Sequence, residues 1–148
     1  MAYSSTIIGR KHEQDILSSC IESNRAEFIA VYGRRRIGKT FLVKQFFGNT
    51  FDFYATGVYK ISRQEQLRLW QEQLAKYSGE KCTKPKDWFE AFDQLRMYLE
   101  TLKGKDKLIL FIDELPWLDT PKSGFIRALD LFWNGWAAER RGLKLVVC

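Results

Sequence analysis

The sequence has few of the residues that stabilise small secreted proteins or bind structural metals. It contains three cysteines, Cys20, Cys82 and Cys148, and a single histidine. The cysteines are odd in number, widely spaced and without a His or Cys neighbour at metal-ligand spacing, which argues against a disulfide framework and against a zinc site. This usage predicts a reducing compartment, and the cytoplasm is the expected location.

Long apolar runs, internal repeats and low-complexity segments are also missing from the sequence. No stretch approaches the roughly 20 apolar residues of a membrane span, and no apolar run follows a basic start at the N-terminus, so we expect no membrane association. The net charge of +6 would suit a polyanionic partner. Basic and acidic residues are interspersed, however, and form no basic tail, so charge alone decides little.

What remains has the composition of one packed domain. The 148 residues are 45% hydrophobic and 15% aromatic, and strand and helix patterns alternate along them. Short apolar runs predict strands at 28–32, 51–56, 108–112 and 143–147. Helical periodicity predicts helices at 11–23, 39–47, 62–77, 88–102 and 123–138. This alternation predicts an α/β fold, with a parallel sheet covered by helices on both faces.

Local signals add detail to three of these segments and to one turn between them. Ser62 and Glu65 have the spacing of a capping box at a helix start. Pro116 and Pro121 bracket an expected turn. The helix expected at 123–138 carries apolar residues almost all round, which predicts burial on more than one side. The first run, 28–32, is unbroken and is typical of a strand buried on both faces.

The segment Gly33–Thr40 reads GRRRIGKT and fits the phosphate-loop pattern G-x-x-x-x-G-K-[ST] at every fixed position. Gly33 and Gly38 allow a tight turn in which successive amide N–H groups converge, and the following helix adds its positive N-terminal end. Lys39 is expected to reach the β and γ phosphates, and the Thr40 hydroxyl to coordinate Mg²⁺. The competing interpretation, a glycine turn on a basic helix, is weakened because a predicted buried strand precedes the motif.

The other residues of this segment occupy variable positions of the pattern. Their backbone N–H groups can contribute to the anion cradle whatever their side chains do, so we include Arg34, Arg35, Arg36, Ile37 and Phe41 among the candidate nucleotide-binding residues. The charge of the three arginines either steers a triphosphate toward the loop or meets a partner surface. By itself it is not evidence for nucleic acid.

A second motif, LILFIDE, spans 108–114. Its apolar run delivers Asp113 and Glu114 to the carboxyl end of a strand, where ligands of open parallel sheets bind, and this is a Walker B pattern. Asp113 is expected to hold Mg²⁺ through its water shell, and Glu114 to orient or deprotonate the attacking water. The candidate catalytic residues are therefore Glu114 and Lys39, and the candidate metal ligands are Thr40 and Asp113. The alternative is an acidic helix start after a strand.

Five segments in this order, IIGRKHE, VYGRRRIGKT, FIDELPWL, FWNGW and LKLVVC, together resemble the archaeal-type ATPases of the STAND class of P-loop NTPases, which are relatives of AAA+ proteins. The resemblance implies a three-layer P-loop fold of the ASCE type with strand order 5-1-4-3-2, which places 143–147 between the P-loop strand and the Walker B strand. It also implies that Gly9 and Arg10 lie near the adenine or the phosphates. From the residues alone, Arg10 is equally well a solvated charge at a helix start.

Members of this family continue beyond the point that corresponds to Cys148. The resemblance therefore implies that residues 1–148 are a partial P-loop ATPase domain, truncated before the fifth core strand, with the lid, winged helix and C-terminal domain absent. The P-loop strand would then be a sheet edge. The resemblance implies that a DNA or protein partner would bind through the missing C-terminal domains. Oligomerisation is a further expectation.

The leading hypothesis for function is Mg²⁺-dependent binding of ATP, with hydrolysis in the full-length protein, so the expected cofactors are ATP and Mg²⁺. Two alternatives stay open. One is a nucleic-acid-binding module, although the aromatic residues fall mainly on helical stripes, which favours core positions over stacking platforms. The other is a nucleotide-binding scaffold without turnover. Without the resemblance, no residue distinguishes ATP from GTP.

Overall fold

The structure, a computed structural model, describes residues 11–31 and 38–148, without the side chain of Lys11. Four strands are found in these ranges: β1 (Glu27–Ala30), β2 (Phe53–Thr56), β3 (Leu108–Asp113) and β4 (Leu143–Val147). The helices of the same ranges are α1 (Lys11–Glu22), α2 (Lys39–Phe46), α3 (Arg63–Ser78), α4 (Trp88–Glu100), α5 (Leu115–Leu118), α6 (Phe125–Gly135) and the 3₁₀ helix η1 (Ala137–Glu139). Strands and helices alternate as the sequence predicts.

The four strands form one parallel sheet in the order β1-β4-β3-β2. Leu110 of β3 lies opposite Leu145 of β4 on one side and Phe53 of β2 on the other. The order confirms the expected position of 143–147 between the P-loop strand and the Walker B strand. Every residue of β3 and β4 is buried, because each of these strands has a neighbouring strand on both sides and a helix-covered core on both faces.

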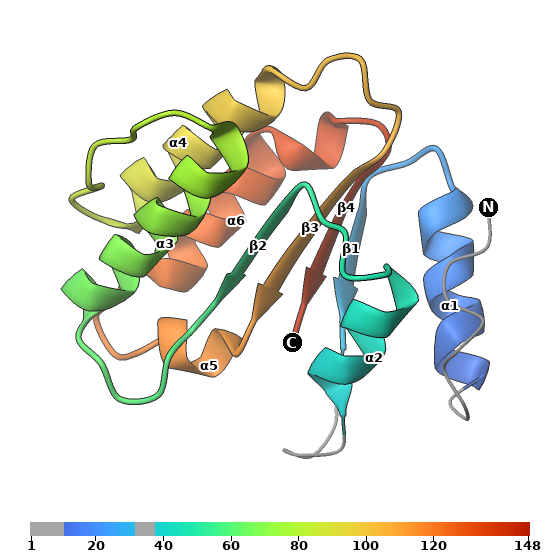
Figure 1. Cartoon of the computed structure of the whole chain (residues 1–148), viewed down its shortest axis with the longest axis horizontal. Coiled ribbons are helices and arrows are strands. Elements are labelled where there is room, and N and C mark those ends of the chain that lie inside the picture. Colours follow the sequence, from blue (N-terminus) through green and yellow to red (C-terminus); the bar gives the residue numbers. More distant parts are fainter. Residues whose placement is uncertain (1–10, 32–37) are drawn as a thin grey trace.

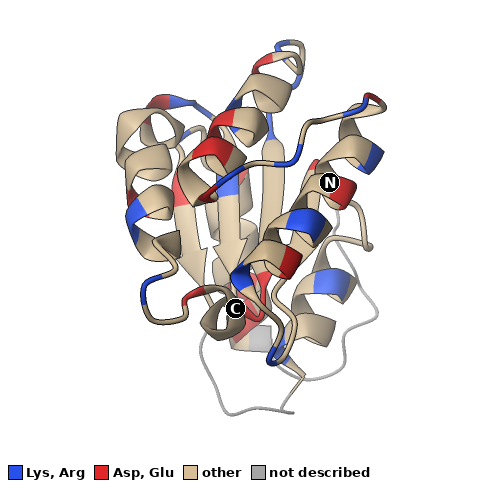
Figure 2. Ribbon diagram, turned by 90° about the vertical axis from the view of Figure 1, so that its left-hand side faces the viewer, with Lys and Arg blue, Asp and Glu red and all other residues tan. Residues whose placement is uncertain are grey.

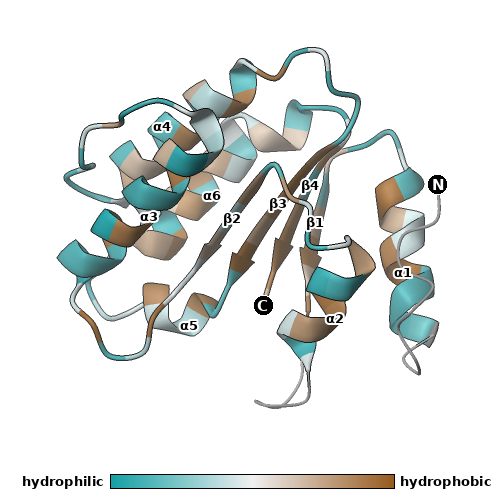
Figure 3. Cartoon of the chain, in the orientation of Figure 1, coloured by the Kyte–Doolittle hydropathy of each residue, from teal (hydrophilic) through white to brown (hydrophobic). Residues whose placement is uncertain are grey.

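Helices cover both faces of the sheet (Figure 1). One face packs against α3, α4 and α6, and its core includes Leu110, Leu145 and Trp70. The other packs against α1 and α2 through Phe111 and Val146. Alternate residues of one strand serve opposite cores, as the pleat requires. Figure 3 shows the strands as a hydrophobic layer between helices whose outer surfaces are largely hydrophilic.

The edge strand β1 departs from the sequence prediction. Only β4 pairs with it among the described strands, and the side chain of Phe28 is 42% exposed. The ring of Phe28 contacts Trp133 edge-on, with ring centroids 5.3 Å apart. The prediction that this run is buried on both faces is therefore wrong for Phe28, because burial on both faces requires a second neighbouring strand and a helix over each face.

The start of α3 confirms the predicted capping interaction in part. The hydroxyl of Ser62 accepts a hydrogen bond from the Glu65 backbone N–H at 3.1 Å. It also donates to the Glu65 carboxylate at 3.3 Å. In a full capping box that carboxylate accepts from the backbone N–H of the cap residue instead. The helix therefore begins where the sequence indicates, with a variant of the expected bonding.

Two predictions between β3 and β4 are wrong. The expected turn bracketed by Pro116 and Pro121 contains a one-turn helix, α5, because a proline is tolerated in the first turn of a helix. The helix expected at 123–138 ends at Gly135 and is followed by η1. It is buried on one side only: Leu131 on its outer side is 62% exposed, and Ile126 is exposed as well.

Candidate nucleotide-binding site

The candidate site lies at the carboxyl ends of the strands, where β3 delivers its acidic residues beside the start of α2. Gly38, with φ of 80°, precedes α2 in the left-handed conformation that favours glycine, and its carbonyl accepts a hydrogen bond from the Leu42 N–H. Lys39 and Thr40 form the first turn of this helix. The other predicted nucleotide-binding residues, Gly9, Arg10, Gly33, Arg34, Arg35, Arg36 and Ile37, lie outside the described residues.

Thr40 and Asp113, the two candidate metal ligands, meet although 73 residues separate them in sequence. The Thr40 hydroxyl donates a hydrogen bond to Oδ2 of Asp113 at 2.8 Å. Oδ1 of the same carboxylate accepts from the Glu114 backbone N–H at 2.9 Å. Asp113 is only 3% exposed, and burial raises the pKa of its carboxyl group against the effect of these two hydrogen bonds.

These oxygens fit a magnesium ion. A buried carboxylate and an adjacent hydroxyl are hard oxygen donors on two different elements, and Mg²⁺ is commonly held by one or two protein oxygens together with phosphate oxygens and waters. A nearby cation would also offset the free-energy cost of the buried negative charge. The residues present therefore suit the ion that the sequence motif leads us to expect.

Glu114 has a strained backbone and an exposed side chain. Its φ of 53° and ψ of 42° lie in the left-handed region, which non-glycine residues adopt at a cost of about 1–2 kcal/mol. Oε2 of its carboxylate accepts a hydrogen bond from the Trp117 indole Nε1–H at 3.0 Å. Strain at a candidate catalytic residue is typical of functional sites.

The neighbouring strand accommodates this conformation through Gly57. The Gly57 N–H donates to the Asp113 carbonyl at 2.9 Å. A Cβ atom added at Gly57 would lie 2.5 Å from the Glu114 carbonyl oxygen, so no other residue fits without a shift. Sequence reasoning gave Gly57 only the role of closing a strand and gave Trp117 no role. Two sequence signals could have indicated these residues: Gly57 directly follows a strand, and Trp117 lies three residues after Glu114.

A cavity of about 1090 Å³ brings the described candidates together. Its lining comprises Gly38, Lys39, Thr40, Phe41, Tyr59, Glu114, Pro116, Trp117 and Cys148. Burial, followed by the nearby Asp113 carboxylate, raises the pKa of the Cys148 thiol to about 12, so this thiol is neutral at physiological pH. The structure thus places Lys39, Thr40, Phe41 and Glu114 around one opening, with Asp113 bonded to Thr40 beneath it.

Comparison with known proteins identifies the family. Residues 8–134 match the model of a family described as an ATPase domain predominantly from Archaea. The chain belongs to this family. It is 32% identical over 109 residues to an uncharacterized protein of Methanocaldococcus jannaschii, a match covering 74% of this chain and 22% of that protein. A 42-residue stretch, 28% of this chain, is 45% identical to an uncharacterized ATP-binding protein of the same organism and covers 71% of it.

A solved structure shows the same fold. The Walker-type ATPase of Pyrococcus abyssi superposes with a TM-score of 0.61 at 19% sequence identity, over 99% of this chain and 46% of that one. The chain of this ATPase family therefore has the α/β architecture of a Walker-type ATPase, and it spans less than half of the solved relative and about a fifth of the first curated one. Among the residues that the structure describes, no helix is long and apolar enough to cross a membrane.

Proposed function

We propose that the carboxyl end of the sheet binds ATP together with Mg²⁺ and that the complete site hydrolyses it. The observation that carries this proposal is the 2.8 Å hydrogen bond between Thr40 and Asp113, because it joins the two sequence motifs that phosphate-loop enzymes use for the metal. Membership of an archaeal ATPase family supports the same reaction. The finer assignment to the STAND class, the cytoplasmic location and the partial extent of the domain are part of the proposal.

Each candidate site residue that the structure describes at the two motifs has a role in this proposal. The amide groups at the start of α2, beside Gly38, would bind phosphate oxygens, and Lys39 would reach the β and γ phosphates. Thr40 and Asp113 would hold Mg²⁺, which when bound neutralises charge on the phosphates. Glu114, exposed at the cavity, would orient the attacking water and accept its proton. The predicted loop residues 33–37 would complete the phosphate cradle.

Nucleic-acid binding is the weaker alternative. Figure 2 shows basic and acidic residues mixed over the helices rather than gathered in one stripe. Trp70 and Trp88 are buried in the core, so they are unavailable for stacking on bases. A DNA or protein partner would then bind through C-terminal domains outside these residues, and oligomerisation remains a separate part of the proposal.

Nucleotide binding is tested by titrating a fluorescent ATP analogue, with and without Mg²⁺, into the wild type and Lys39→Ala. Removing a charge-assisted contact to phosphate should weaken affinity by at least about tenfold. Lys76→Ala, an exposed lysine in α3, removes the same charge and should bind as the wild type does. Equal affinity of all three proteins would reject the phosphate-loop assignment. Salt-sensitive DNA binding that survives Lys39→Ala would favour the alternative.

Turnover is tested with Glu114→Gln. This variant should keep its affinity for ATP while hydrolysis falls by about 100-fold or more, because a general base contributes about that much. Normal hydrolysis in Glu114→Gln would remove Glu114 from the catalytic role. Nucleotide binding without hydrolysis in the full-length wild type would instead identify a scaffold that does not turn over.

A further inference from the structure

The Glu114 carboxylate is exposed, yet it has a fixed partner. A free glutamate on a surface samples several rotamers, and holding it in one of them costs conformational entropy. Here Oε2 accepts the Trp117 indole N–H at 3.0 Å, within the normal range for a charge-assisted hydrogen bond. The contact leaves Oε1 available to face the cavity that both residues line. An indole N–H donates only, so this pairing cannot be reversed.

Trp117 is itself held from two directions. The ring of Tyr59, on the β2–α3 loop, meets the Trp117 ring edge-on with centroids 4.5 Å apart. The Trp117 backbone carbonyl accepts a hydrogen bond from Nε2 of Gln66, a buried residue of α3, at 3.2 Å. The same Gln66 amide donates to the Val58 carbonyl and accepts the Val58 N–H. Ring and backbone of Trp117 are therefore both held by contacts within the chain.

We propose that Trp117 is a positioning residue for Glu114: its indole N–H holds the carboxylate in the orientation from which Oε1 meets the attacking water. This inference rests on the proposed function, in which Glu114 acts on that water. The strained backbone of Glu114 aims the side chain, and Trp117 fixes its end. Small errors in the placement of a catalytic group lower the rate strongly, so a fixed rotamer matters more for turnover than for affinity.

The kinetic test is Trp117→Phe, which keeps an aromatic ring against Tyr59 and removes the N–H donor together with the five-membered part of the indole. Turnover at saturating ATP should fall about tenfold, while affinity for the fluorescent ATP analogue stays within about twofold of the wild type. Trp133→Phe is the matched control: Trp133 lies in α6 against Phe28, and its replacement should leave both quantities unchanged. Wild-type turnover in Trp117→Phe would overturn the proposal, and so would a loss of affinity as large as the loss of turnover.

A spectroscopic test reads the contact without relying on hydrolysis. The indole N–H signal of Trp117 in a ¹⁵N-resolved NMR spectrum is assigned by its disappearance in Trp117→Phe. Glu114→Ala should shift this signal and accelerate exchange of its proton with water, and leave the other indole signals in place. An unmoved Trp117 signal would overturn the proposal. Failure of the nucleotide site itself would appear separately, as unchanged nucleotide affinity in Lys39→Ala.

Discussion

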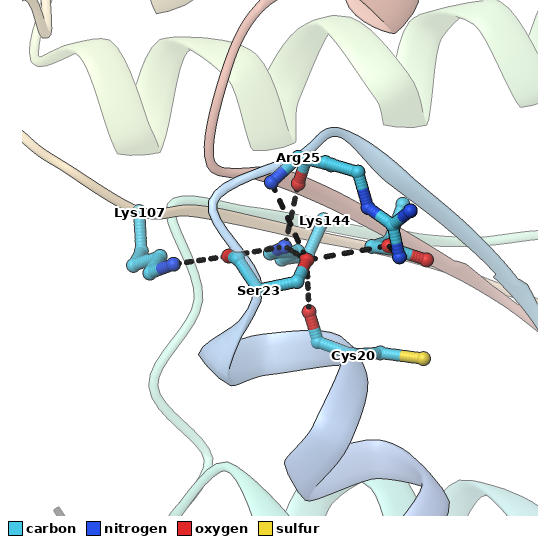
Figure 4. Close-up of polar contacts among 6 residues, drawn as sticks. Cys20, Ser23, Arg25, Lys107 and Lys144 are labelled. Atoms are coloured by element: carbon cyan, nitrogen blue, oxygen red, sulfur yellow. Dashed lines mark hydrogen bonds and ion pairs between the residues drawn. The ribbon is translucent and has the colours of Figure 1, made fainter.

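At the carboxyl ends of the strands, Thr40 and Asp113 bond to each other beside an exposed glutamate, whereas at the amino ends Lys144 is fully buried and bonded to the loop that follows α1. Its Nζ donates to the Ser23 carbonyl and hydroxyl and to the Arg25 carbonyl, at 2.9, 2.8 and 2.6 Å (Figure 4). Lys107 donates to the same Ser23 carbonyl. Both ends therefore contain an ionisable group whose pKa burial has shifted. Asp113 accepts from a side-chain hydroxyl, whereas Lys144 donates mainly to backbone carbonyls.

The two ends differ in whether a ligand could replace the existing hydrogen bonds. Backbone carbonyls of Ser23 and Arg25 cannot leave the Lys144 ammonium without a rearrangement of the loop, and burial lowers the pKa of this lysine. The Thr40 hydroxyl can turn from Asp113 toward an ion with little change in the backbone. We infer that amino-end polar groups serve stability and carboxyl-end polar groups serve binding, and the following variants separate the two.

The largest effect is expected from Gly142→Ala at the amino end. Gly142 has φ of 80°, and an added Cβ would lie 1.9 Å from the Asp106 carbonyl oxygen. A clash with backbone together with left-handed strain should lower the free energy of unfolding by about 3 kcal/mol or more. Gly48→Ala is the control, because Gly48 has φ of 60° but open space, and should lose only about 1 kcal/mol. Equal losses in urea unfolding would contradict the account.

Lys144→Met should have the next largest effect. It removes the donor to three oxygens and should destabilise the fold by about 2 kcal/mol, with ATP affinity within twofold of the wild type. Lys107→Met loses the same charge, but the Ser23 carbonyl keeps its bond from Lys144, so the loss should be smaller. Urea unfolding and nucleotide titration measure both variants. A fall in ATP affinity with Lys144→Met would remove the distinction between the two ends.

Asp113→Asn should show the reverse of Lys144→Met: a large loss of ATP affinity and little loss of stability. Burial disfavours the Asp113 carboxylate in the folded state, and the amide keeps one oxygen to accept the Glu114 N–H while its NH₂ can donate to the Thr40 hydroxyl, so the free energy of unfolding should stay close to that of the wild type. The Mg²⁺-dependent part of ATP affinity should fall by about tenfold or more, because a carboxylate ligand is lost. A loss of stability comparable to that of Lys144→Met would show that Asp113 is structural rather than a ligand.

The smallest effect expected is a pH dependence of stability. Burial raises the pKa values of Tyr54 and Tyr98 from 10.0 to about 12, so their contribution is fully present below pH 10 and is lost as the pH rises toward 12. Lys144 acts in the opposite sense, because its lowered pKa favours the folded state as the pH rises. Tyr98→Phe should therefore flatten the alkaline decline in urea midpoints, and Lys144→Met should steepen it. An identical decline in all three proteins would contradict these assignments.

The sequence predicted much of the fold and part of the site. Unbroken runs such as 108–112 indicated buried parallel strands, and the two motifs predicted that Thr40 and Asp113 would lie at one edge of the sheet. Burial of Lys144 was not predictable, because it depends on carbonyls that a separate loop supplies. The Trp117–Glu114 contact depends on the left-handed backbone at Glu114, which no residue pattern encodes.

Exposed apolar residues on α6 illustrate the same limit. Periodicity cannot tell which stripe of a uniformly apolar helix meets a neighbour, and here Phe125, Leu129 and Phe132 face the core while Leu131 faces outward. Single-residue features of the carboxyl edge, such as Gly57 beneath the Glu114 carbonyl, likewise follow from tertiary contacts. Motif spacing therefore predicted the location of the site, and packing determined its detailed geometry.

Hydrogen–deuterium exchange with and without ATP and Mg²⁺ tests the central claim most directly, because it reads both ends of the sheet in one experiment. We predict slower exchange of backbone amides in 38–43 and 113–118, at the carboxyl ends, and no change in 23–27 and 141–144, at the amino ends. Slower exchange confined to the amino-end loops, or none at the carboxyl ends at saturating ATP and Mg²⁺, would contradict the assignment of the nucleotide site.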